Sequence, residues 1–137
     1  MRQTFNPPGV PAPGGCYSQV VRVGDLVFLS GVAGQDEQRR LVGKDVGTQT
    51  RQALRNLATG LAAVGGSLAD VCYVTAFLEH ADEDFAAYNS AYAEFFPVDP
   101  PARATVQAHI VGDGLLVEVQ AIAVLGGGAG VSTRRQL

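Results

Sequence analysis

Glu118 is the residue whose setting most suggests chemistry. It is the lone acid in the run LLVEVQAIAVL, from Leu115 to Leu125. Side chains of a strand alternate between two faces, and the neighbours on its own face are Leu116, Gln120, Ile122 and Val124. Because glutamate is rarely buried without a partner, two interpretations stay open. Glu118 is a carboxylate on a solvated edge or in an ion pair, or it is a general acid or base with a raised pKa in an apolar pocket.

Arg103 is the second candidate, and it opens another strand directly after Pro100 and Pro101. A planar guanidinium can hold a carboxylate or phosphate through two parallel hydrogen bonds, although most arginines simply lie on the surface. The strand alternates strictly, which predicts one polar and one apolar face. The polar face carries Arg103, Thr105, Gln107 and His109, and the inward face carries Ala104, Val106, Ala108 and Ile110.

The spacing of the two candidates indicates whether a simple hairpin can bring them together. Residues 112–114 suit a tight turn, which places Arg103 opposite Val124 and on the same sheet face as Glu118. The two side chains would then stand roughly 20 Å apart, too far to touch one small ligand. Either the register differs or the pocket is assembled between subunits. The second alternative is favoured by composition, because 47% of the residues are apolar and only 17% are charged, against roughly 25% charged in a typical domain.

The elements that must position these residues follow from apolar spacing and turn residues. The sequence predicts a Pro- and Gly-rich arm at 1–16, a hairpin at 17–30, a polar loop at 34–47 whose charges face water, helices at 48–64 and 82–96, and a strand at 71–78. The second helix carries an aromatic stripe of Phe85, Tyr88, Tyr92, Phe95 and Phe96. The order β-β-α-β-α-β-β predicts an α+β fold in which two helices cover one face of a mainly antiparallel sheet.

Length and charge exclude several classes of protein. The 137 residues fit one domain at 1–125, followed by a Gly-rich flexible tail at 126–137. A net charge of −3 without basic blocks makes nucleic acid an unlikely partner, and no apolar run approaches the roughly 18 residues that cross a bilayer. The start lacks the apolar stretch of a signal peptide, and two cysteines make no disulfide framework, so we expect a cytoplasmic protein. His80 and His109 lack partners at metal-ligand spacing, so we expect no metal.

Four segments closely resemble the RidA/YjgF family of reactive intermediate deaminases, also described as the endoribonuclease L-PSP family. They are CYSQVVRVGDLVFLSG from Cys16, the helix–strand–helix segment ending in DFAAYNSAYAEFF, PPARATV from Pro100, and LLVEVQAIAV from Leu115. The resemblance implies a chorismate-mutase-like fold that forms a homotrimeric barrel with ligand clefts between subunits. It also implies hydrolysis of enamino and imino acids, such as 2-aminoacrylate, to a 2-keto acid and ammonia without metal or organic cofactor.

Matched motif by motif, the resemblance assigns roles to individual residues. Arg103 would clamp the substrate carboxylate and Glu118 would position or activate the hydrolytic water, while the cleft would be lined by Tyr17, Ser30, Gly31, Asn89 and Thr105. Three positions depart from the family's common residues and put the shape of the cleft in doubt: Cys16, Val32 and Thr105. Two other functions remain, a trimeric carboxylate-binding or chaperone-like module and, less favoured by the charge, a ribonuclease.

Overall fold

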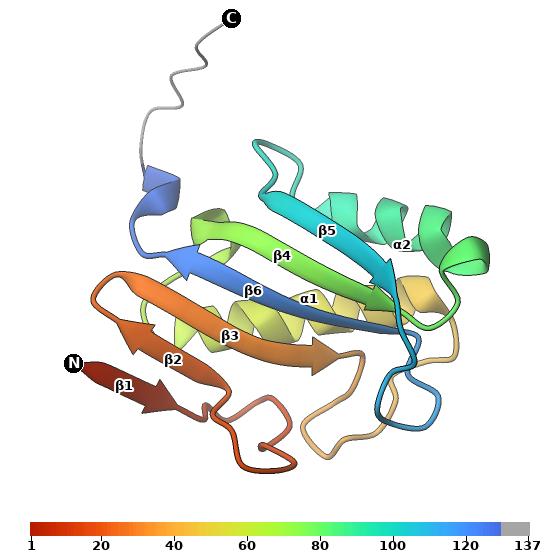
Figure 1. Ribbon diagram of the computed structural model, residues 1–137, viewed down its shortest axis with the longest axis horizontal. Coiled ribbons are helices and arrows are strands. Elements are labelled where there is room, and N and C mark those ends of the chain that lie inside the picture. Colours follow the sequence, from red (N-terminus) through yellow and green to blue (C-terminus); the bar gives the residue numbers. More distant parts are fainter. Residues whose placement is uncertain (130–137) are drawn as a thin grey trace, which may run out of the picture.

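The computed structural model describes residues 1–129 as one six-stranded sheet with two helices packed against one of its faces (Figure 1). The strand order is β1-β2-β3-β6-β4-β5, and β4 and β5 form its parallel pair. The strands are β1 (Arg2–Phe5), β2 (Val20–Val23), β3 (Leu26–Ala33), β4 (Val71–Leu78), β5 (Ala102–Gln107) and β6 (Val117–Val124). The predicted α+β fold, with two helices on one face of a mainly antiparallel sheet, is confirmed.

The helices α1 (Val46–Ala62) and α2 (Ala81–Phe95) lie within two residues of the predicted spans. Helix α1 starts earlier than predicted because the Asp45 carboxylate caps it, accepting a hydrogen bond from the Thr48 N–H at 2.9 Å. It ends before Gly65, which has a φ of 78° and lets the chain leave the last turn. Short 3-10 turns, η1 (Leu68–Asp70) and η2 (Gly127–Ala129), contact each other, and η2 opens the predicted tail. Residues 130–137 of that tail lie outside the described part of the chain.

The core lies between the helices and the sheet. Fully buried leucines of α1, Leu54, Leu57 and Leu61, pack on Val27, Val74, Val117 and Val119 of the central strands. This cluster accounts for the amphipathic spacing of the first helix and for the buried apolar residues that alternate along β6.

Two expectations about the strands are wrong. The sequence analysis missed β1, which pairs with β2 at the edge of the sheet; its four residues are largely exposed and carry no apolar alternation. Residues 102–107 and 117–124 do not form a hairpin with each other, because β5 pairs in parallel with β4, and β6 lies between β3 and β4. Strands with a long crossover between them leave little local signal of their partner.

The faces of β5 are also opposite to the prediction. Arg103 and Gln107 turn toward α2, where the Gln107 side chain accepts a hydrogen bond from the Ala81 N–H at 3.1 Å. Val106, expected inward, lies on the uncovered sheet face and is 44% exposed. The polar face of this strand is therefore the one that meets the helix layer.

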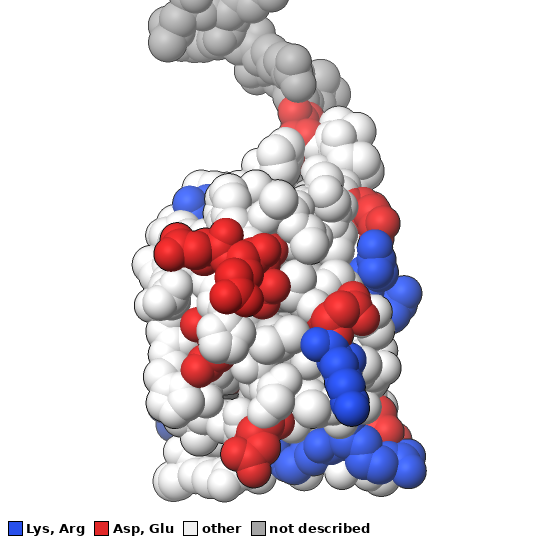
Figure 2. All heavy atoms as spheres, turned by 90° about the vertical axis from the view of Figure 1, so that its right-hand side faces the viewer, with Lys and Arg blue, Asp and Glu red and all other residues white. Residues whose placement is uncertain are grey.

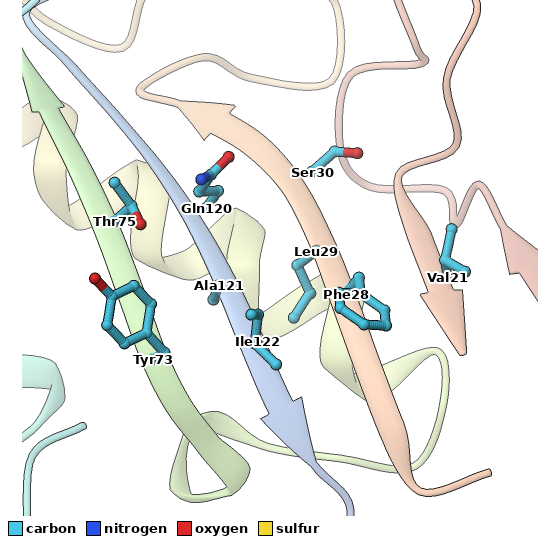
Figure 3. A pocket seen from close by; sticks show the side chains of 9 residues that line it. All are labelled: Val21, Phe28, Leu29, Ser30, Tyr73, Thr75, Gln120, Ala121 and Ile122. Atoms are coloured by element: carbon cyan, nitrogen blue, oxygen red, sulfur yellow. The ribbon is translucent and has the colours of Figure 1, made fainter. Parts of the chain in front are cut away.

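The uncovered face of the sheet carries a broad apolar surface, part of which is hollowed to about 430 Å³ between β3, β6 and β4 (Figure 3). Phe28, Tyr73 and Ile122 stand together there, each more than a third exposed. Other exposed apolar side chains of the same face are Val23, Leu26, Val106 and Val124. Contiguous exposed apolar surface of this kind is typical of a region that binds another molecule.

Charged side chains are mixed on the face drawn in Figure 2. Acidic side chains gather in one patch, and most of the basic ones lie away from it beside other acids. The first turn of α2 carries three acidic residues, Asp82, Glu83 and Asp84. Negative charge at this position stabilises a helix N-terminus. Within residues 1–129, no helix is both long and apolar enough to cross a membrane.

Candidate active site

Glu118 lies near the start of β6, half-buried on the uncovered side of the sheet. Its register partners are Ala33 on β3 and Phe77 on β4. Burial raises the pKa of its carboxyl above the ordinary value. A half-buried carboxyl with a raised pKa is the setting that the second of the two interpretations from the sequence requires.

A bulge in β3 makes room for that carboxylate. Ser30 and Gly31 together stand opposite Gln120, so the pairing of β3 with β6 shifts by one residue. A side chain at Gly31 would place its Cβ 2.9 Å from Cδ of Glu118. A side chain at this position would therefore displace the Glu118 carboxylate.

Glu118 and Gly31 belong to a cleft of about 740 Å³ whose outer wall is the Pro- and Gly-rich arm. Of the predicted substrate-binding residues, Tyr17 and Ser30 line the same cleft. The Ser30 hydroxyl donates a hydrogen bond to the carbonyl of Ser18 at 2.6 Å, so it holds the segment that follows the arm beside the cleft. The volume is typical of small-molecule sites.

Arg103 forms a second cluster at the edge of the sheet, on the side of the helices. Its guanidinium carbon lies 4.6 Å from the ring centre of Tyr92 and 5.3 Å from that of Tyr88. Its Nη2 donates to Oδ1 of Asn89 at 2.8 Å, and the Thr105 hydroxyl is buried nearby, beside Tyr88. Burial raises the pKa of both tyrosines, that of Tyr92 to about 12. Neutral rings therefore flank the cation, and two of its five N–H donors are engaged, by Asn89 and, at 3.5 Å, by the Tyr88 hydroxyl.

The structure thus divides the predicted site into two half-sites. The first, called the cleft, holds Tyr17, Ser30, Gly31 and Glu118; the second, called the arginine cluster, holds Asn89, Arg103 and Thr105. They cannot meet within one protomer, because Arg103 pairs with Val74 on the helix face and Glu118 pairs with Phe77 on the uncovered face. The prediction that both share one sheet face is wrong, and its cause is the absent β5–β6 hairpin.

Some residues of the site were missed from sequence. Tyr88 and Tyr92 were predicted as an aromatic stripe, but nothing in their spacing indicated that they would flank an arginine. Arg39 is exposed, as expected, and it also lines the cleft. Its position depends on the turn that precedes it, which carries no distinctive motif. Phe77 and Leu115 add apolar walls to the cleft.

The chain can now be compared with known proteins. The family model described as Endoribonuclease L-PSP matches residues 9–125. The chain belongs to this family, the RidA/YjgF family. Among residues 1–129 of this RidA/YjgF member, His, Cys, Asp and Glu side chains do not gather in groups of three or more that could hold a metal ion.

Relatives of this RidA/YjgF protein include named deaminases. The chain is 36% identical over 123 residues to "3-aminoacrylate deaminase RutC" of Acinetobacter baylyi, covering 89% of this chain and 97% of that one. It is 38% identical over 116 residues to "Reactive Intermediate Deaminase A, chloroplastic" of Arabidopsis thaliana, covering 84% of this chain and 62% of that one. The crystal structure of RidA from an Antarctic Psychrobacter is 35% identical, with a TM-score of 0.84 over 90% of this chain and 99% of that one. Relatives with deaminase names thus match this chain in sequence, and a structure named RidA matches it in fold.

Proposed function

We propose that the protein is a homotrimeric, cofactor-independent deaminase that hydrolyses 2-enamino and 2-imino acids to a 2-keto acid and ammonia. The observation that carries the proposal is the Glu118 carboxylate, half-buried with a raised pKa in a cleft of substrate size. The deaminase names of relatives at 36–38% identity support the reaction class.

The two half-sites supply complementary parts of one reaction. Arg103 binds the substrate carboxylate with the N–H donors that Asn89 and the tyrosine rings leave available. Glu118 takes one proton from a water as the water oxygen bonds to C2 of the imine, and returns that proton to the nitrogen, which gives a tetrahedral carbinolamine. The second water proton, now on the carbinolamine hydroxyl, then passes through Glu118 to the nitrogen, the C–N bond breaks, and ammonia leaves as the C2 carbonyl forms. The imine is already electrophilic, so orientation and one proton relay suffice.

The half-sites meet in this proposal where two copies pack together. The uncovered, apolar sheet face is a surface that a second copy can cover, and the cleft opens at its margin through Ser30 and Gln120, which border both hollows. In a cyclic trimer each copy offers the same two surfaces to different neighbours, so three identical sites form. Each would join the cleft of one copy to the arginine cluster of the next.

The direct test is the release of ammonia and 2-keto acid from freshly generated 2-aminoacrylate, compared with the uncatalysed background. We expect the parent protein to accelerate release, Arg103→Ala to weaken binding and turnover together, and Glu118→Gln to bind nearly normally while kcat falls about 10²- to 10⁴-fold. Equal kcat in Glu118→Gln and the parent would contradict the role of Glu118. No acceleration by an intact trimer, with either 2-aminoacrylate or 3-aminoacrylate, would favour a carboxylate-binding module instead.

A further inference from the structure

Arg39 occupies a backbone conformation that its side chain does not favour. Its φ is 63°, in the left-handed region where glycine is the usual residue. A turn from Asp36 imposes it: the Arg39 N–H donates to the Asp36 carbonyl at 2.9 Å, and the Asp36 carboxylate accepts from the N–H groups of Gln38 and Arg40. The third position of such a short hairpin loop is the one at which glycine is commonly found. An arginine there calls for a role that its side chain fulfils.

The Arg39 side chain reaches from this turn to the arm that walls the cleft. Its Nη2 donates to the carbonyl of Ala12, and its guanidinium lies against Gly14, where an added Cβ would be 3.1 Å from Nη2. The Gly14 N–H in turn donates to the hydroxyl of Tyr17 at 3.0 Å. A chain of contacts therefore runs from the turn through Arg39 and the arm to Tyr17, a residue of the cleft.

A salt bridge does not explain the position of the Arg39 guanidinium. Arg39 has no carboxylate within salt-bridge distance among the ion pairs formed by residues 1–129, whereas its neighbour Arg40 pairs with Asp36 at 2.9 Å. Other side chains also hold the arm: the Glu37 carboxylate accepts a hydrogen bond from the Gly9 N–H at 3.2 Å, and the Gln19 amide donates to the Pro11 carbonyl. Arg39 holds the next part of the arm, at the Ala12 carbonyl.

We propose that Arg39 is a positioning residue that clips residues 11–17 over the cleft and thereby fixes Tyr17 for substrate binding. The effect on catalysis rests on the proposed deaminase function, but the clip itself does not. Backbone strain of this kind is concentrated at residues that serve a functional site.

Arg39→Gly separates this role from a merely structural one, because glycine fits the turn and lacks the guanidinium. We expect Tm to stay within about 2 °C of the parent or to rise, amide hydrogen exchange in residues 9–17 to become faster, and KM for 2-aminoacrylate to rise about five- to tenfold with kcat within about twofold. Arg39→Lys, which can still reach the Ala12 carbonyl, should restore part of the protection. Arg40→Ala, which removes the adjacent surface guanidinium, is the matched control and should leave exchange in the arm and KM unchanged.

A double variant tests whether Arg39 acts through Tyr17. With Tyr17→Ala in the background, Arg39→Gly should add little further loss of kcat/KM, because neighbours in one contact chain are non-additive. Additive losses would overturn the link to Tyr17, and unchanged exchange in residues 9–17 would overturn the clip. If no variant or parent shows deaminase activity but exchange quickens only in Arg39→Gly, the clip stands and the proposed function fails.

Discussion

Gly31→Ala displaces the Glu118 carboxylate without removing it. The new Cβ would lie 2.9 Å from Cδ, 3.1 Å from Oε1 and 3.2 Å from Cγ of Glu118. Carbon atoms in contact normally keep about 3.5–4.0 Å, so the carboxylate must move by roughly half an ångström or more. A misplacement of about 1 Å can cost about 100-fold in rate. We therefore expect kcat for 2-aminoacrylate to fall about 10- to 100-fold while KM changes less.

The matched control is Gly15→Ala, a second glycine of the same cleft. Its added Cβ would lie 4.0 Å from Cε1 of Tyr17, an ordinary contact, so kcat should stay within about twofold of the parent. Steady-state kinetics and thermal melts of both variants make the comparison. Parent-like kcat in a folded Gly31→Ala protein would refute the placement of the Glu118 carboxylate in the reaction.

Three further predictions concern charge and assembly. If the half-sites meet between subunits, Arg103→Ala should raise the pKa of Glu118, measured by NMR titration of its carboxyl carbon, because burial remains and the cation is lost; an unchanged pKa would separate the two groups. The hydrogen bond to Glu79, at 2.6 Å, raises the pKa of His109. The pKa of Glu79 is lowered, most by its hydrogen bond from the Ile110 N–H and next by its hydrogen bond with His109. The contribution of His109 to stability should thus be complete below its unfolded pKa and lost as pH rises through its higher folded pKa. Urea unfolding should therefore show His109→Ala to be less stable than the parent near pH 5.5 and equally stable near pH 9. A loss of stability that is the same at both pH values would contradict the His109–Glu79 pair. Ile122→Glu should turn the proposed trimer into monomers on sizing, because it places a charge on the uncovered apolar face; a parent trimer that stays intact in this variant would show that this face is not the interface.

Local pattern was enough to predict the helices and the chemistry-bearing residue types. Strand β4 was predicted at its observed bounds because its eight residues form a β-prone run without polar alternation. Glu118 could be selected because it departs from the apolar pattern of its strand, and Arg103 because it opens a polar-faced strand directly after two prolines.

Strand partners and distant contacts could not be predicted in the same way. The turn at 112–114 does reverse the chain, with φ values of 132° and 73° at Gly112 and Gly114, but it returns β6 to a position between β3 and β4 rather than beside β5. That choice depends on packing across the whole sheet. The contact of Arg39 with the arm likewise joins residues 27 positions apart through a turn that composition does not reveal.

Complementation between inactive variants tests the central claim, that each site joins Arg103 of one copy to Glu118 of the next. Arg103→Ala and Glu118→Gln are unfolded together, refolded in equal amounts and checked for mixed trimers by native mass spectrometry. Half of the copies keep Arg103 and the other half keep Glu118. An intact site needs Glu118 from one copy and Arg103 from its neighbour, so about one quarter of the sites should be intact and about one quarter of parental activity should return. Mixed trimers no more active than the two variants alone would contradict a shared site.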